Sequence, residues 1–247
     1  MVNPVLQVDS VFKRFSENES WVLEDLNLRV NQGEFISLVG ASGCGKSTLL
    51  NLLAGLDQPS SGSIEASTQP TLMFQESALL PWLSAGKNVE LPILFTGAKK
   101  VEREARAKEL LTSVNLEHSY NKRPHELSGG MKQRVAIARA LAQDSKILLM
   151  DEPFAALDAI TRDLLHEEIV RIWRENNLTV VFVTHNVREA VRLGQRVLLM
   201  SSRPGRFVKE WKIDIKEPRR IDSPEIALMA REITDDLRSE IRRHADA

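Results

Sequence analysis

One segment constrains the fold of this 247-residue chain more than any other: residues 40–47, with the sequence GASGCGKS. It fits the pattern G-x-x-x-x-G-K-[ST] and lies between a strand-like apolar stretch, Phe35–Val39, and a helical stretch, Ser47–Leu53. Glycines in such a turn let backbone N–H groups point at phosphate oxygens, and the positive end of the helix favours negative charge there. Lys46 then meets the β- and γ-phosphates of a nucleoside triphosphate, and the Ser47 hydroxyl meets Mg²⁺. The residues expected to contact the nucleotide here are Gly40, Ala41, Ser42, Gly43, Cys44, Gly45, Lys46, Ser47 and Thr48.

The composition limits the classes of partner. The chain carries 33 Lys and Arg against 34 Asp and Glu, a net charge of -1. No overall positive field draws it to nucleic acid or to anionic lipid, so we expect no nucleic-acid partner. The amino-terminal residues lack the basic and apolar regions of a secretory signal, and no uncharged stretch approaches the ~20 residues that span a bilayer. We therefore expect a cytosolic protein unless a partner holds it at a membrane.

The single cysteine, Cys44, excludes an internal disulfide framework and a multi-cysteine metal site. It suits a reducing compartment. Cys44 is either a small residue that fills the loop or a redox-active thiol, and we favour the first interpretation. A thiol beside the phosphate site would make nucleotide binding sensitive to alkylation.

The periodicity along the chain predicts an α/β core with an inserted helical segment. Strand-like stretches at residues 6–12 and 26–30 suggest a small antiparallel layer, and the residues after the first helix predict a turn, Pro59–Ser63, and then a strand, Thr71–Phe74. Helical periodicity occupies residues 99–116 and 131–142. Near-continuous aliphatic stretches return at 147–150, 180–183 and 197–200, with an amphipathic helix at 160–173 between the first two. This order predicts a parallel sheet that is covered on both faces.

Two acids follow one of these aliphatic stretches. Asp151 and Glu152 come directly after Ile147–Met150, so the predicted strand places both carboxylates at the carboxyl edge of the sheet, beside the phosphate segment. Acids at the end of a strand are often only solvated loop residues. Downstream of a phosphate-binding segment, we expect Asp151 to support the metal shell and Glu152 to position or deprotonate water.

Several further segments resemble the motifs of ATP-binding cassette (ABC) ATPases. Residues 127–134, LSGGMKQR, are similar to the family's signature sequence, although Met131 stands where many members carry Gln. Gln75 matches the Q-loop, residues 156–158 the D-loop, and His185 the switch histidine. The resemblance runs in the family's order from about residue 5 to residue 215. It implies a RecA-like parallel-sheet core with a small antiparallel β layer (residues 1–75 and 146–215), a helical subdomain (76–145) and a carboxyl-terminal helical tail (216–247).

The resemblance also implies a division of the site between two subunits. Two cassettes pair head to tail, and each signature contacts the nucleotide of the other subunit. The residues implied to act in this way are Ser128, Gly129, Gly130, Gln133 and Asp158. The exposed N–H groups where residues 131–142 begin their helix would attract a γ-phosphate, although a glycine turn can also merely start a helix.

Roles in hydrolysis follow from the same resemblance, since the reaction needs positioned water and charge stabilisation rather than covalent chemistry. Glu152 would polarise the water, and His185 and Lys46 would contact the γ-phosphate. Mg²⁺ would be held by Ser47 and Gln75 directly, and by Asp151 through water. Phe15 matches the aromatic position that stacks on adenine, and we favour that role over an ordinary core residue. A lone histidine such as His185 is more often structural, and the matching motif reverses that expectation.

What the ATP energy drives is predicted from the chain length and from three short segments. Only 52 residues separate Gln75 from Ser128, too few for the long coiled coil of a repair ATPase, and one phosphate segment argues against a two-cassette ribosome factor. Residues 80–82, 151–159 and 202–206 resemble the bacterial importer branch for nitrate, taurine and aliphatic sulfonates. There the motor subunit works at the cytoplasmic face of the membrane with a permease dimer and, indirectly, a solute-binding protein. An exporter motor, or less favoured a soluble non-transport ATPase, remains the alternative.

Two segments have more than one interpretation. The apolar residues 78–83 next to Gln75 either face a membrane partner or pack within the helical segment. The predicted helix in the tail, after Ser223-Pro224, carries one apolar face: Ile226, Met229, Ile233, Leu237 and Ile241. We expect that face to pack on the chain's own core rather than to form a dimer or regulatory contact.

Overall fold

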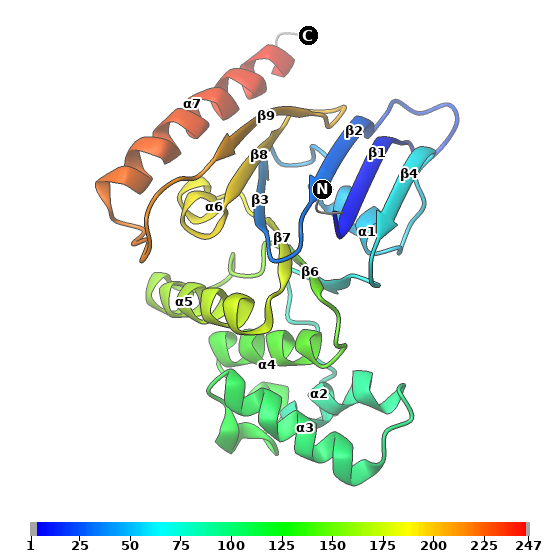
Figure 1. Ribbon diagram of the computed structural model, residues 1–247, viewed down its shortest axis with the longest axis vertical. Helices are drawn as coiled ribbons and strands as arrows, with labels where there is room; N and C mark the ends of the chain where they lie inside the picture. Colours follow the sequence, from blue (N-terminus) through cyan, green and yellow to red (C-terminus); the bar gives the residue numbers. More distant parts are fainter. Residues whose placement is uncertain (1–3, 246–247) are drawn as a thin grey trace.

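The computed structural model describes residues 4–245 and is built around a sheet of six strands (Figure 1). The strand order is β5-β6-β7-β3-β8-β9. The strands are β3 (Phe35–Gly40), β5 (Thr71–Met73), β6 (Ile147–Asp151), β7 (Thr179–Val183), β8 (Arg196–Met200) and β9 (Phe207–Lys212). All neighbours are parallel except β8 and β9, which are antiparallel. The predicted α/β class with a parallel core is confirmed.

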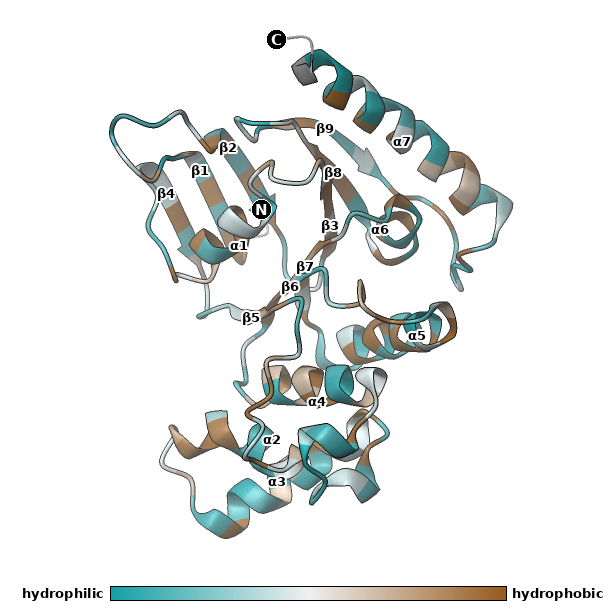
Figure 2. Cartoon of the chain, turned by 180° about the vertical axis from the view of Figure 1, so that it is seen from behind, coloured by the Kyte–Doolittle hydropathy of each residue, from teal (hydrophilic) through white to brown (hydrophobic). Residues whose placement is uncertain are grey.

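The two faces of the sheet belong to different cores because side chains alternate along each strand. In β3, Phe35 packs with the helices α4 (Gly129–Leu141) and α5 (Ala159–Asn176), whereas Ile36 and Leu38 pack with α1 (Lys46–Leu53) and the small sheet. Both sets are fully buried, which explains why these strands read as continuous apolar runs. Figure 2 shows the same concentration of hydrophobic residues in the central strands.

The small sheet is antiparallel, as predicted, but it has three strands. β1 (Leu6–Lys13) pairs with β2 (Leu23–Val30) on one side and with β4 (Ser61–Ala66) on the other. The predicted turn at Pro59–Ser63 is therefore wrong at its carboxyl end. An ideal Cβ on Gly62 would lie 2.2 Å from the Ser10 carbonyl oxygen, and its φ is +85°, so glycine allows this strand to approach β1. The mostly exposed side chains of β4 have no apolar alternation, which hid the strand in the sequence.

The helical segment between β5 and β6 lies below the sheet in Figure 1 and contains α2 (Ala85–Leu94), α3 (Lys100–Ser113) and α4. Two short 3-10 turns, Glu117–Ser119 and Pro124–Glu126, join α3 to α4. Its apolar side chains share one core with β6 and β7. The segment therefore packs directly on the sheet that carries the phosphate-binding motif.

The tail forms α7 (Pro224–Ala245), which packs beside α6 (Val187–Leu193) and next to β9 (Figure 1). Ile226 and Ile233 are fully buried in a core with Trp211 of β9, and Met229 and Leu237 pack against it. Most of the predicted apolar face thus covers the chain's own core. Ile241 is the exception, because it is 44% exposed.

Candidate functional site

The phosphate-binding motif connects β3 to α1 with a backbone that depends on glycine. Gly43 and Gly45 have φ of +76° and +106°, values that other residues rarely adopt. An ideal Cβ on Gly45 would also lie 2.5 Å from Leu23 Cδ2. No side chain caps the first turn of α1. Its N–H groups and positive dipole are therefore directed at the loop, as an anion site requires.

Lys46 is held across this loop by backbone oxygens. Its Nζ donates to the carbonyls of Gly40 (2.9 Å) and Ala41 (2.8 Å), and only 7% of the residue is exposed. Cys44 lies beneath, also buried, and burial raises the pKa of its thiol. A buried thiol with a raised pKa reacts slowly with alkylating reagents, so the structure does not support the expected alkylation sensitivity. Cys44 fills space, as the favoured interpretation states.

A cavity of 510 Å³ opens in front of this loop. It is lined by Val22, Ser42, Gly43, Gly45, Lys46, Ser47, Thr48, Gln75, Glu152 and Arg203. The structure thus brings Gln75 and Glu152, which are far apart in sequence, to the phosphate-binding loop. Arg203 was not predicted. Phe15 does not line the cavity; its ring is 61% exposed, with Lys13 Nζ 5.3 Å from the ring centroid.

The two acids differ in environment although they are adjacent. Asp151 ends β6, bonds to the Ser47 side chain, and has a pKa that is raised mainly by burial. Glu152 is turned away from the strand by a φ of +45°, while its N–H donates to the Val183 carbonyl at 2.9 Å. Its Oε2 lies 2.6 Å from His185 Nδ1. The predicted catalytic pair is therefore in hydrogen-bond contact at the rim of the cavity.

The signature residues lie at the start of α4. Ser128 caps this helix, because its Oγ accepts from the Met131 N–H at 3.3 Å. Gly129 is exposed, and Gly130 is buried so closely against α5 that an ideal Cβ would lie 2.5 Å from Thr161 Cγ2. Asp158 caps α5 by accepting from the Thr161 N–H at 3.0 Å. The side chains of these residues do not line the cavity, which agrees with a role toward another subunit.

Gln133 departs from the prediction. It is only 4% exposed, on the buried side of α4, so its amide is not at the surface where a partner's nucleotide would bind. The structure therefore gives no support to the prediction for Gln133. The prediction assigned Gln133 to the partner's nucleotide from its position in the signature motif. The helical periodicity of α4 instead puts Gln133 on the face that packs on the core.

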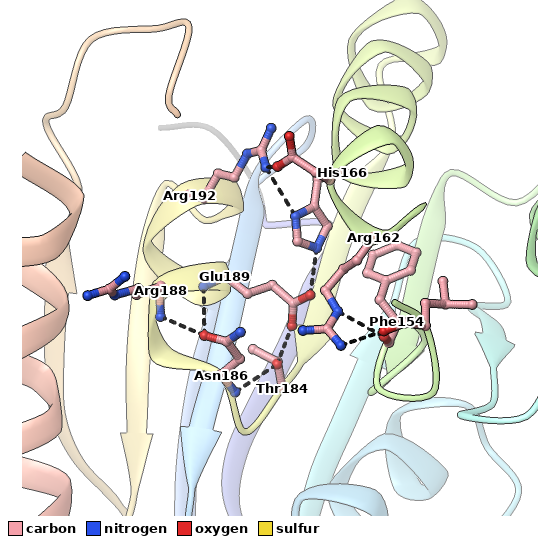
Figure 3. Close-up of polar contacts among 10 residues, drawn as sticks. Phe154, Arg162, His166, Thr184, Asn186, Arg188, Glu189 and Arg192 are labelled. Atoms are coloured by element: carbon pink, nitrogen blue, oxygen red, sulfur yellow. Dashed lines mark hydrogen bonds and ion pairs between the residues drawn. The ribbon is translucent and has the colours of Figure 1, made fainter. Parts of the chain in front are cut away.

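A buried polar network that includes Thr184, the residue before His185, was not predicted either (Figure 3). The Thr184 hydroxyl donates to Glu189 of α6, and the other Glu189 oxygen lies 2.5 Å from His166 Nε2 of α5. Arg192 Nη1 lies 3.4 Å from His166 Nδ1 and pairs with Asp163. The network joins the loop that carries His185 to the helix that Asp158 caps. The sequence did not indicate this network, because polar residues on a helix usually face solvent.

The comparisons with known proteins agree with this geometry. Residues 23–155 match the family model described as ABC transporter. This chain belongs to the ABC transporter family. It is 44% identical over 222 residues to an aliphatic sulfonates import ATP-binding protein of Pseudomonas savastanoi, covering 90% of this chain and 79% of that protein. It is also 44% identical over 223 residues to a nitrate import ATP-binding protein of Synechococcus elongatus, covering 86% of this chain but only 34% of that protein.

Among solved structures, the chain resembles a dimeric ATP-binding cassette in a post-hydrolysis state bound to ADP and Pi. The TM-score is 0.74 at 35% identity, over 85% of this chain and 100% of that one. The cassette hydrolyses ATP, as predicted, and the predicted likeness to the nitrate and sulfonate branch is confirmed. In the part of the chain that the structure describes, no helix is long and apolar enough to cross a membrane.

Proposed function

We propose that this chain is the ATP-hydrolysing motor subunit of a bacterial importer for a small solute such as nitrate, an aliphatic sulfonate or taurine. The observation that carries the proposal is the Glu152–His185 pair at the rim of the phosphate cavity, 2.6 Å between Oε2 and Nδ1. A carboxylate there can orient water toward a γ-phosphate, and the imidazole can hold that carboxylate or contact the phosphate. The names of the nitrate and sulfonate relatives support import over export.

The oxygen donors beside Lys46 suit Mg²⁺. Ser47 bonds to Asp151, and Gln75 lines the same cavity, which supplies hydroxyl, carboxylate and amide oxygens, the ligand type that Mg²⁺ prefers. When bound, Mg²⁺ neutralises phosphate charge. Ser47 and Gln75 would hold it directly and Asp151 through water. Lys46, whose Nζ rests on two carbonyls, would hold the β- and γ-phosphates.

The signature supports a head-to-tail pair of cassettes. Ser128 and Asp158 cap the starts of α4 and α5, are exposed, and do not line the chain's own cavity. Two positive helix ends are thus available to another subunit. A second subunit would receive them at its nucleotide. Each copy would then supply what the other needs, and hydrolysis would depend on pairing.

The segment after Gln75 supports a permease contact. Arg139 of α4 donates to the carbonyls of Ser77 and Ala78, both at 2.8 Å, and the buried Asn88 of α2 bonds to Leu80. The segment is thus fixed to the helical subdomain while Trp82 stays 68% exposed.

Leu79 of the same segment packs into the core, so the packing interpretation of residues 78–83 holds for this residue, and the permease contact is proposed for the exposed Trp82. Beside the segment lies a cavity of 180 Å³ that includes Leu83, Leu91 and Leu94. A permease helix seated there, at the cytoplasmic face of the membrane, would sense Gln75.

The catalytic part is tested with Glu152→Gln. We expect ATP affinity to stay within a few-fold while turnover falls at least a hundredfold, because the amide orients water without acting as a base. A stable nucleotide-bound dimer should accumulate in size-exclusion chromatography. Near wild-type turnover of the variant would remove Glu152 from its role.

The transport part needs the natural partners. The chain is co-purified with its permease and placed in proteoliposomes, and ATPase activity is measured with and without the solute-binding protein. Stimulation that requires the loaded binding protein supports import. Stimulation by solute without it would favour an exporter.

A further inference from the structure

The turn between β8 and β9 lies against the phosphate-binding loop and is firmly held. The Gly205 N–H donates to the Val22 carbonyl at 2.9 Å, and the Gly205 carbonyl accepts from the Glu24 N–H at 3.1 Å. The Ser201 hydroxyl bonds to the Pro204 carbonyl and to the Arg206 N–H, both at 2.8 Å.

The same turn also packs closely on the phosphate-binding loop. An ideal Cβ on Gly205 would lie 2.3 Å from the Cys44 carbonyl oxygen, so only glycine permits this approach. The turn is therefore a rigid part of the cavity wall rather than a mobile loop.

Arg203 and Arg206 lie on either side of Gly205, and only Arg206 has an ion-pair partner among the residues that the structure describes. Arg206 pairs with Glu24 at 2.5 Å, an interaction that raises the pKa of Arg206. Arg203 lines the cavity and makes no hydrogen bond, ion pair or ring contact with any residue from 4 to 245. Of the residues that line the cavity, Lys46 and Arg203 are the two cations, and Lys46 already donates to two carbonyls. Arg203 is a free guanidinium beside the site of a polyanion.

We propose that Arg203 is a further nucleotide-binding residue, whose guanidinium pairs with the α- and β-phosphates. Its turn is joined to Val22, whereas Gln75 and Glu152 define the γ-phosphate end of the same cavity. A guanidinium offers several N–H donors in a plane and keeps its charge at all working pH values, so it suits adjacent phosphate oxygens. The inference rests on the nucleotide site proposed above.

The test compares Arg203→Gln with Arg206→Gln, which removes the same charge three residues away in the same turn. Affinities of the full chain for a non-hydrolysable ATP analogue, ADP and adenosine are measured by calorimetry with Mg²⁺. Arg203→Gln should lower the affinity for the ATP analogue and for ADP about tenfold each, because both ligands lose one charge-assisted contact. Adenosine affinity and the melting temperature without nucleotide should not change. Arg206→Gln should leave all affinities unchanged.

Lys46→Ala separates failure of this inference from failure of the site. If Lys46→Ala abolishes binding but Arg203→Gln binds both nucleotides as the wild type does, the role of Arg203 is refuted and the site stands. A loss confined to the ATP analogue would also refute the assignment to the α- and β-phosphates. Undiminished binding by Lys46→Ala would refute the site and the inference together.

Discussion

Replacing Gly130 by alanine tests whether this glycine is needed for the packing of α4 on α5 or also for ATP hydrolysis. Gly130 lies in the first turn of α4, buried against α5, and an ideal Cβ would lie 2.5 Å from Thr161 Cγ2. Carbon atoms in good contact are ~3.5–4.0 Å apart, so one of the two groups must move by about 1 Å. Thr161 cannot rotate freely, because its side chain and its N–H both bond to Asp158. The added methyl group therefore strains the contact between α4 and α5.

The size of the effect follows from two opposing contributions. Overpacking a close contact by one methyl group costs about 1–3 kcal/mol. Alanine gains about 1 kcal/mol over glycine within a helix. We therefore expect Gly130→Ala to lower the free energy of unfolding by about 0–2 kcal/mol. Thr161→Ser removes only the clashing methyl group and keeps the hydroxyl, so the double variant should lose the strain. The coupling between the two sites is predicted to be about 1–3 kcal/mol.

The assay is urea unfolding of the nucleotide-free chain, followed by tryptophan fluorescence, to which the buried Trp173 contributes. It is run on the wild type, both single variants and the double variant. ATPase activity is measured on the same four proteins. Recovery of stability in the double variant without recovery of activity would show that Gly130 also serves the partner's nucleotide. Effects that add to within about 0.5 kcal/mol would refute the steric reasoning, because uncoupled sites behave in that way.

Three further predictions concern buried charges. Asp151→Asn should raise the melting temperature of the nucleotide-free chain at pH 7, while turnover falls. Burial raises the pKa of the Asp151 carboxyl in the folded chain. The stability that this group contributes is therefore present below its unfolded pKa and is lost as pH rises through its folded pKa. Glu168→Ala should destabilise the chain by about 3 kcal/mol in urea, since Arg134 Nε, 2.9 Å away, loses its buried partner. Glu189→Ala should cost about 2–4 kcal/mol, with reduced turnover, because His166 and the switch loop lose a shared buried acceptor.

Buried apolar strands and glycine-rich turns were predictable because their signals are local. The runs at 35–39, 147–150 and 180–183 are apolar on both faces, and helices cover both faces in the structure. The start of α4 was predicted two residues late, at Met131, although Ser128 is a favoured cap. The sequence alone pointed to residues 40–48, Gln75 and Glu152, and the structure places Gln75, Glu152 and most of the loop around one cavity; the contact between Glu152 and His185 was not predicted.

The missed features depend on contacts between distant segments. β4 is a strand because β1 supplies its backbone partners, and nothing in its own side chains requires it. β9 pairs antiparallel with β8 and buries Trp211, so its place follows from the sheet edge and from α7. The burial of Gln133 depends likewise on which face of α4 packs on the core. Arg203 lies in residues 202–206, which were compared only with the importer branch. Because this segment is far from the phosphate loop in sequence, the proposed role of Arg203 in the cavity was not predicted.

The exposure of Glu152 and His185 bears on the proposed dependence of hydrolysis on a second subunit. Glu152 is held in a left-handed backbone conformation by the bond from its N–H to Val183, and a non-glycine residue in that conformation stores strain. Its partner His185 has a side chain that is 65% exposed. Water around an exposed pair screens its interaction with a phosphate, whereas a covering subunit would exclude that water and strengthen each contact. The buried Thr184–Glu189–His166 network fixes the loop beneath His185 in advance. In the proposed pair, the second subunit would supply desolvation and the signature residues, while Glu152 and His185 would keep the positions that they have here.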